Sequence, residues 1–221
     1  MKAIKWVGVA ALAAVAGAAN AADEGNWMVR ARVLHMNPHN GNDGGLVGAG
    51  AVPDVEAENK VFPEVDISYF FTKNIAAELI LTYPQKHDVE LDGLGKIGTV
   101  KHLPPTLTLQ YHFNPDGTFR PYVGAGINYT RFSSVDLDAN LALAGTTGLP
   151  LRVDRSSFGW ALQVGADYKL ADKWFFNVDL KYVTIDTEIY VKDNAAALQG
   201  AKVSKLDIDP LLFSVGIGYR F

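Results

Sequence analysis

The side chains that could perform chemistry in this sequence do not gather into a recognisable catalytic or metal site. The chain has 221 residues, with five histidines and no cysteine, and the histidines lack the spacing typical of metal ligands. Paired acids such as Asp207 and Asp209 lie near predicted loops, where such pairs are usually solvated. Ser156 or Ser157 with His102 is the least implausible nucleophile and base for an enzyme acting on lipids, but nothing in the sequence brings them together. We therefore expect no metal, no cofactor and no enzymatic activity.

A second group of reactive side chains consists of charged residues at alternate positions along otherwise apolar segments. Acids and bases occur there in similar numbers, so they can form hydrogen-bonded ion pairs, the least costly way to hold charge in a narrow space. The predicted set is Arg30, Arg32, Asp66, Glu78, Asp167, Lys169, Asp179, Lys181 and Arg220, accompanied by Glu64, Gln110, His112, Asn177 and Ser214. We interpret this set as a plug.

The segments that carry these charges have the period-two pattern of β-strands with two different faces. Eight such segments, each about 9 to 13 residues long, can be counted in the chain. The apolar face of the third segment is formed by Ile75, Ala77, Leu79, Leu81 and Tyr83, and that of the eighth by Leu211, Phe213, Val215, Ile217, Tyr219 and Phe221. Aromatic residues lie mostly at the ends of these rows.

The connections between the segments alternate between short and long. Short turns are predicted at 72–74, 114–117 and 171–173, and long loops rich in Gly and Asp at 37–61, 84–100, 133–156 and 186–205. Short periplasmic turns, long external loops, apolar outer rows and aromatic girdles are typical of transmembrane β-barrels. The predicted fold is therefore all-β, an eight-stranded antiparallel transmembrane β-barrel with long external loops and short periplasmic turns.

A soluble eight-stranded barrel such as a lipocalin is the alternative fold, because it also alternates and is also secreted. It would bury the apolar rows and expose the charged ones. It would leave the aromatic girdles and the alternating loop lengths without a reason, whereas closure in lipid explains both and keeps the charges in a polar lumen.

The N-terminal segment 1–21 has the pattern of a secretory signal peptide, with two lysines, an apolar run and small residues before a cleavage point near Ala21. Residues 22–221 then form a single barrel domain. Removing the two lysines leaves 18 basic and 24 acidic residues, a formal charge of −6, which argues against a nucleic-acid partner. Beyond the signal, no apolar run reaches the roughly 20 residues of a membrane-spanning helix.

Apolar residues replace the charges at the inward positions nearest the long loops. They are Leu34, Met36, Ile80, Phe132, Val183, Ile185, Ile208 and Leu212. Because small-molecule sites are mostly apolar, these positions predict a ligand-binding funnel at the outer mouth, above the plug. The alternative is that they only pack against one another beneath the loops.

A molecule stopped by the plug needs another exit, and prolines indicate where the wall is weakest. Proline has no N–H to donate to a neighbouring strand, so it weakens pairing locally. We expect a lateral gate at Pro104 and Pro105 facing Tyr83, with Pro210 as a further weak point. The alternative is that these prolines only end strands and shape loops.

Several stretches give the chain a resemblance to the OmpW family of small outer-membrane barrels. They are 102–107 (HLPPTL), 120–130 (RPYVGAGINYT), 163–168 (QVGADY), 185–187 (IDT) and 206–210 (LDIDP). The resemblance implies a non-catalytic channel for passive uptake of small hydrophobic solutes, with sideways release into outer-membrane lipid.

The C-terminal Phe221 resembles the aromatic signal that Gram-negative outer-membrane barrels present to their assembly machinery. A barrel that transports nothing and binds phage, toxin or host surfaces through its external loops is the alternative function.

Overall fold

The structure is a computed structural model that describes residues 25–39, 41–43, 55–57, 59–82, 85–91, 95–139, 149–154, 156–191 and 202–221. Every regular element in these ranges is a β-strand, and none of them contains a helix with the length and hydrophobicity needed to cross a membrane. The strands are β1 (Trp27–Asn37), β2 (Gly41–Asp43), β3 (Val55–Ala57), β4 (Lys60–Phe70), β5 (Ile75–Thr82), β6 (Gln85–Leu91), β7 (Gly95–Leu103), β8 (Thr106–His112), β9 (Phe119–Ala139), β10 (Leu149–Val153), β11 (Ser156–Lys169), β12 (Trp174–Val183), β13 (Asp186–Val191), β14 (Lys202–Asp207) and β15 (Leu211–Arg220).

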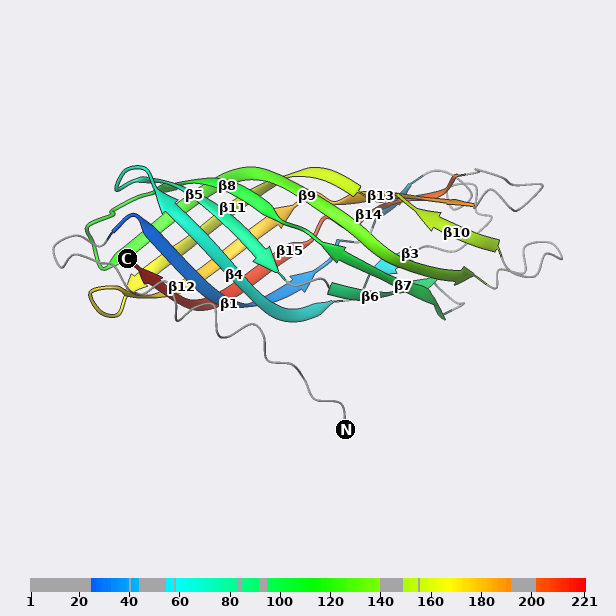
Figure 1. Ribbon diagram of the computed structural model, residues 1–221, viewed down its shortest axis with the longest axis horizontal. Coiled ribbons are helices and arrows are strands. Elements are labelled where there is room, and N and C mark those ends of the chain that lie inside the picture. The colour runs from blue at the N-terminus through cyan, green and yellow to red at the C-terminus, as the bar shows by residue number, and fades with distance from the viewer. Residues whose placement is uncertain are drawn as a thin grey trace, which may run out of the picture.

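Eight of these strands form a closed antiparallel barrel, which confirms the predicted fold. In the order β1, β4, β5, β8, β9, β11, β12 and β15, each strand pairs with the next, and β15 returns to pair with β1 (Figure 1). Closure also joins the start of β1 to the residue after β15, because Trp27 and Phe221 exchange backbone hydrogen bonds of 3.0 and 2.8 Å. A closed barrel leaves no free strand edge in the sheet.

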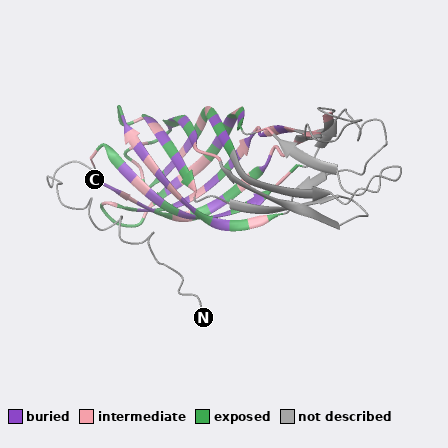
Figure 2. Cartoon of the chain, turned by 45° about the vertical axis from the view of Figure 1, so that its right-hand side comes forward, coloured by how far each residue is buried: buried purple, intermediate pink, exposed green. Residues whose placement is uncertain are grey.

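The alternation in the sequence becomes an alternation between the lumen and the outer surface. Along β1, the even-numbered residues from Met28 to Met36 are buried and the odd-numbered residues between them face outward. The same banding runs around the barrel (Figure 2). Antiparallel register then places inward charges side by side, as in the pair Arg30 and Asp66 on β1 and β4.

The outer surface carries the apolar rows, with aromatic rings concentrated near the ends of the strands. Near the start of β1 and the end of β15, Trp27 and Tyr69 pack at 4.8 Å between ring centroids, and Trp174 and Tyr219 at 4.9 Å. Trp160 contacts Tyr182 at 5.5 Å near the opposite end of β11 and β12. An apolar surface of this kind, bounded by aromatic girdles, is suited to a bilayer.

The two ends of the barrel differ. Three short turns and the C-terminus lie at one end, which we call the turn end (Figure 1). The turn between β8 and β9 is held by local bonds: Gly117 N–H donates to the Asn114 carbonyl at 3.1 Å, and Asn114 Nδ2 donates to the Phe119 carbonyl at 3.0 Å. Asn114 has a φ of 50°, a left-handed conformation that asparagine tolerates well.

At the opposite end, the loop end, the sheet continues farther than the sequence predicted. The predicted long loops contain β2, β3, β6, β7, β10, β13 and β14, and β9 runs for 21 residues. These segments lack a long alternating apolar row, but they pair with one another and thereby satisfy their backbone groups above the barrel. The assignment of these whole segments as loops was therefore wrong.

Candidate functional site

The interior of the barrel is divided into three layers along its axis. An apolar cavity lies toward the loop end, a network of buried charges occupies the middle, and a small apolar cluster lies toward the turn end. Inward parity of the strands sets the residues in each layer, because each strand contributes one inward side chain at every second position.

The middle layer is built around Arg30, whose side chain is fully buried. Its Nη1 donates to Glu78 Oε1 at 2.8 Å and to Ser68 Oγ at 2.7 Å. Its Nε and Nη2 donate to the two carboxylate oxygens of Asp167 at 3.1 and 2.7 Å. One guanidinium thus links carboxylates from opposite sides of the barrel, and it binds Asp167 in the bidentate geometry that suits arginine.

A second group of charges lies beside the first and nearer the loop end. Arg32 Nη1 lies 3.3 Å from Glu64 and 3.1 Å from Asp66, and its Nη2 lies 3.2 Å from Glu78. Lys181 Nζ lies 2.6 Å from Glu64 and 3.2 Å from Asp179. In this network three cations, Arg30, Arg32 and Lys181, meet the five carboxylates Glu64, Asp66, Glu78, Asp167 and Asp179.

Neutral polar side chains connect the charges across the lumen. Gln163 Nε2 donates to Glu78 at 2.8 Å and to Asp179 at 2.7 Å, and Gln110 Nε2 donates to Glu78 at 2.7 Å. The Tyr122 hydroxyl donates to Asp179 at 2.7 Å. Tyr122 and Gln163 were not among the predicted plug residues. Both could have been found from the alternation, because the even-numbered residues of β9 and the odd-numbered residues of β11 face inward.

Glycine makes room for the large Tyr122 side chain. A Cβ at Gly165, on the neighbouring strand β11, would lie 2.4 Å from the Tyr122 hydroxyl oxygen. The ring therefore lies across the lumen where only a glycine permits it. Together with the ion pairs, Tyr122 fills the middle of a barrel that is already narrow, as expected for eight strands.

The third layer closes the lumen at the turn end. Met28, Phe70, Ala76 and Phe175 form a buried cluster. Arg220 lies over the Phe70 ring at 3.9 Å from its centroid, within the range of a cation–π contact. The predicted plug residues Arg220 and Lys169 belong to this level rather than to the central network: Lys169 is half-buried and pairs in register with Phe175.

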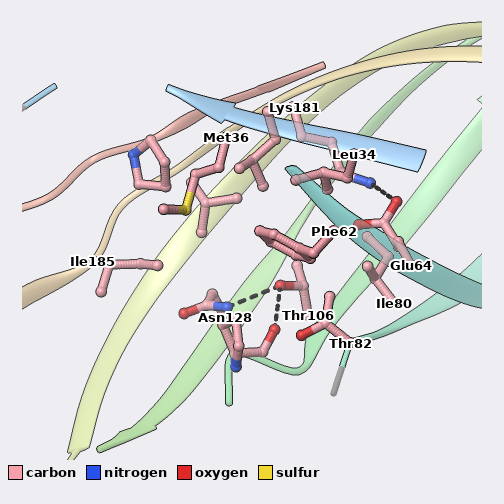
Figure 3. A pocket seen from close by; sticks show the side chains of 14 residues that line it. Leu34, Met36, Phe62, Glu64, Ile80, Thr82, Thr106, Asn128, Lys181 and Ile185 are labelled. Atoms are coloured by element: carbon pink, nitrogen blue, oxygen red, sulfur yellow. Dashed lines mark hydrogen bonds and ion pairs between the residues drawn. The ribbon is translucent and has the colours of Figure 1, made fainter. Parts of the chain in front are cut away.

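The cavity above the network is the candidate binding site (Figure 3). Its volume is about 30 Å³, about the space of a single water molecule. A larger apolar ligand must therefore move side chains such as Met36 and Phe62. The lining residues are Leu34, Met36, Phe62, Glu64, Ile80, Thr82, Pro104, Thr106, Asn128, Lys181, Val183, Ile185, Pro210 and Leu212.

Most of the predicted ligand-binding residues line this cavity: Leu34, Met36, Ile80, Val183, Ile185 and Leu212. Ile208 does not line it; it is half-buried, and its N–H donates to the Ile185 carbonyl at 2.9 Å. The side chain of Phe132 lies outside the described part of the structure. Phe62 was not among the predicted residues, although it packs with Leu34 and Met36 and shares their inward parity.

The described part of the barrel wall beside the cavity has an interruption in its strand pairing. Among the described residues, the ladder between β5 and β8 ends at the pair Ile80 and Thr106, and the next pair along the wall is Gln85 and His102 between β6 and β7, shifted in register. Pro104 and Pro105 lie in this interruption, both half-buried. The predicted gate residue Tyr83 lies outside the described residues.

The wall on the other side of Pro105 remains joined, because Tyr129 N–H donates to the Pro105 carbonyl at 3.1 Å. Pro210, the other predicted weak point, lines the cavity but lies in a paired part of the wall, where its carbonyl accepts a hydrogen bond from Val183 N–H at 3.2 Å. Within the described ranges, the strand pairing is therefore interrupted on the β5 side of Pro104 and Pro105.

Comparison with known proteins agrees with this architecture. Residues 23–221 match the OmpW family. Outer membrane protein W of Vibrio cholerae serotype O1 is 36% identical over 97% of both chains. The crystal structure of OprG from Pseudomonas aeruginosa superimposes with a TM-score of 0.73 at 26% identity, covering 89% of this chain and 96% of OprG.

The name of a third relative refers to a specific compound, dibenzothiophene. The dibenzothiophene metabolism operon protein PahQ of Pseudomonas aeruginosa is 33% identical over 57% of this chain and 54% of its own length. From the family match over almost the whole barrel, the chain belongs to the OmpW family of bacterial outer-membrane barrels.

Proposed function

We propose that this barrel is a passive channel through which small hydrophobic molecules cross the outer membrane. They enter the apolar cavity from the external loop end, are stopped by the ionic plug, and leave sideways into the bilayer. The observation that carries the proposal is the position of the cavity, which lies directly above a hydrogen-bonded ionic network and beside the interruption at Pro104 and Pro105.

The chemistry of the plug supports a lateral rather than an axial route. An apolar molecule passing along the axis would have to separate the Glu64–Lys181 pair, at 2.6 Å, and then the contacts of Arg30. Breaking one buried pair costs roughly 3–5 kcal/mol. Among the described residues, Leu81 and Thr82 form no ladder pair with Pro104 and Pro105, so widening the wall there separates no ion pair, and we place the exit at Pro104 and Pro105 rather than at Pro210.

The name of the relative PahQ supports an apolar substrate class, because dibenzothiophene is a small aromatic molecule with almost no polar surface. The same proposal includes export by a signal peptide cleaved near Ala21 and insertion guided by Phe221. No enzymatic step forms part of this function.

Uptake of naphthalene by intact Gram-negative cells that contain a cytoplasmic naphthalene-oxidising reporter tests the cavity. Cells that make the wild-type barrel should oxidise naphthalene several-fold faster than cells without it. Val183→Trp fills the cavity and should return the rate to that of cells without the barrel. Leu180→Trp, on the lipid-facing side of the same strand, is the matched control and should keep the wild-type rate. An unchanged rate in Val183→Trp contradicts the proposal.

The same assay tests the lateral exit. Pro104→Ala with Pro105→Ala restores two backbone donors and should slow uptake, because it permits strand pairing across the interruption. Pro63→Ala is the control, since Pro63 faces the lipid and lies in β4, where it is paired in register with Val33 of β1. Normal uptake in the folded double variant would exclude sideways release beside these prolines.

A further inference from the structure

One hydroxyl group in the cavity has no hydrogen-bond partner among the described residues. Thr82 is the last residue of β5 and lines the cavity; its Oγ1 is buried and makes no hydrogen bond. A buried polar atom without a partner destabilises the protein, because the hydroxyl has given up its bonds to water and gained none in exchange. A ligand atom that bonds to this hydroxyl would remove that cost.

The polar neighbours of Thr82 are already engaged. Asn128 Nδ2 donates to Thr106 Oγ1 at 2.8 Å, and Asn128 Oδ1 accepts from Thr130 Oγ1 at 2.7 Å. Thr106 Oγ1 in turn donates to the Pro104 carbonyl at 3.3 Å. Among the described residues on this side of the cavity, the Thr82 hydroxyl is therefore the group left to bind a ligand.

The neutral polar residues of the cavity lie on one side of it. Thr82, Thr106 and Asn128 lie together, while Met36 and Leu34 lie across Phe62 from them, beside the ion pair of Lys181 and Glu64 (Figure 3). Because Lys181 and Glu64 already bind each other at 2.6 Å, a ligand with a polar end and an apolar body would place its polar end toward Thr82.

We infer that the cavity selects molecules with an apolar body and one terminal hydrogen-bonding oxygen, such as medium-chain alcohols, and that Thr82 is the residue that binds this oxygen. This inference rests on the proposed function, since it names the substrate class of the same cavity. Thr82 lies two residues beyond Ile80, the last β5 residue paired with β8, and across the interruption from Pro104. The bound oxygen is thereby placed next to the proposed exit.

A comparison of two ligands of equal size tests this inference. 1-Octanol and nonane have the same number of non-hydrogen atoms and differ in one hydroxyl. Their apparent Kd values for the folded barrel in lipid nanodiscs are measured from the chemical shift of the Ile80 methyl groups. The ratio of the two values is then compared between wild type and variants, so that partition into lipid cancels.

In Thr82→Val, the preference for 1-octanol over nonane should fall about fivefold, the value of one typical hydrogen bond. Thr82→Ser keeps the hydroxyl and should keep the preference. Thr187→Val is the matched control, because Thr187 also has a buried hydroxyl without a partner but does not line the cavity.

The outcomes separate the role of Thr82 from the channel function. If both ligands bind and the ratio is the same in wild type and Thr82→Val, the role of Thr82 is wrong while the channel function stands. The role of Thr82 is also wrong if Thr187→Val changes the ratio as much as Thr82→Val does. If neither ligand binds the wild-type barrel, the proposed function and the inference fail together.

Discussion

Replacing Arg30 by methionine should destabilise the barrel strongly. Methionine approximates the length of the side chain but removes the arginine that pairs with Asp167 at 2.7 Å and with Glu78 at 2.8 Å, and leaves Glu78 with Arg32 at 3.2 Å. Removing one member of a buried ion pair costs roughly 3–5 kcal/mol, because the other charge stays buried without compensation. With two carboxylates affected, we expect the free energy of unfolding to fall by at least about 3 kcal/mol.

An exposed ion pair of the same length provides the control. Lys73 Nζ lies 2.8 Å from Asp116, but the two side chains are 69% and 75% exposed, and such pairs contribute only about 0–1 kcal/mol. Lys73→Met should therefore change stability by less than about 1 kcal/mol. The two variants separate the effect of burial from the effect of distance.

Urea unfolding of the barrel in phospholipid vesicles, followed by tryptophan fluorescence, measures both variants. Adding Glu78→Gln and Asp167→Asn to Arg30→Met should recover most of the loss, because the neutral amides no longer require a cation. If Arg30→Met alone lies within about 1 kcal/mol of wild type, the central network does not hold these charges in a dry lumen.

Three further outcomes follow from the structure. Val164→Arg, on the lipid face, should lower the free energy of unfolding in vesicles by about 2–4 kcal/mol, and an unchanged value would contradict the assigned orientation of β11. Asp66→Asn should destabilise the barrel less than Asp167→Asn in the same urea assay. Carboxylates outnumber cations in the network, and the oxygens of Asp66 accept no hydrogen bond whereas Asp167 accepts one from Arg30 at 2.7 Å. A larger loss of stability in Asp66→Asn would contradict this ranking of the two carboxylates. Hydrogen bonds from Lys202 and Tyr190 lower the pKa of Glu188 beyond the membrane, so its stabilising effect is present above the usual pKa and lost as pH falls through the lowered one. Lys202→Ala should raise that pKa in a carboxyl NMR titration, and no change would refute the cause.

The sequence was sufficient to predict the barrel because its signals are local. Alternation of apolar and polar residues, and aromatic residues at the ends of the apolar rows, are expected of a strand that has lipid on one face, and the turn residues mark where such strands end. Inward parity likewise placed Arg30 and Lys181 in the lumen. It did not separate the charges by height: Arg220 and Lys169 have the same parity but lie at the level of Phe175, because strand tilt and shear set their position along the axis.

Other features depend on packing between distant segments. The position of the Tyr122 ring across the lumen depends on Gly165 of the neighbouring strand, which leaves space for that ring. Thr82 could not be singled out from its type or spacing, because its missing partner is a property of its surroundings. The strands beyond the barrel, such as β13 and β14, have short polar sequences that resemble loops, and they are defined by pairing rather than by burial.

If the barrel is a channel for small apolar molecules, these molecules occupy the cavity inside the barrel and not only the lipid around it. Neighbouring residues of β5 distinguish the two, since Ile80 faces the cavity with 3% exposure while Leu79 and Leu81 face outward with 38% and 37%. Nuclear Overhauser contacts from 1-octanol to methyl-labelled protein in deuterated lipid nanodiscs provide the measurement. We expect contacts to the methyl groups of Ile80, Leu34 and Met36, and contacts confined to Leu79 and Leu81 would show that the molecules stay in the lipid.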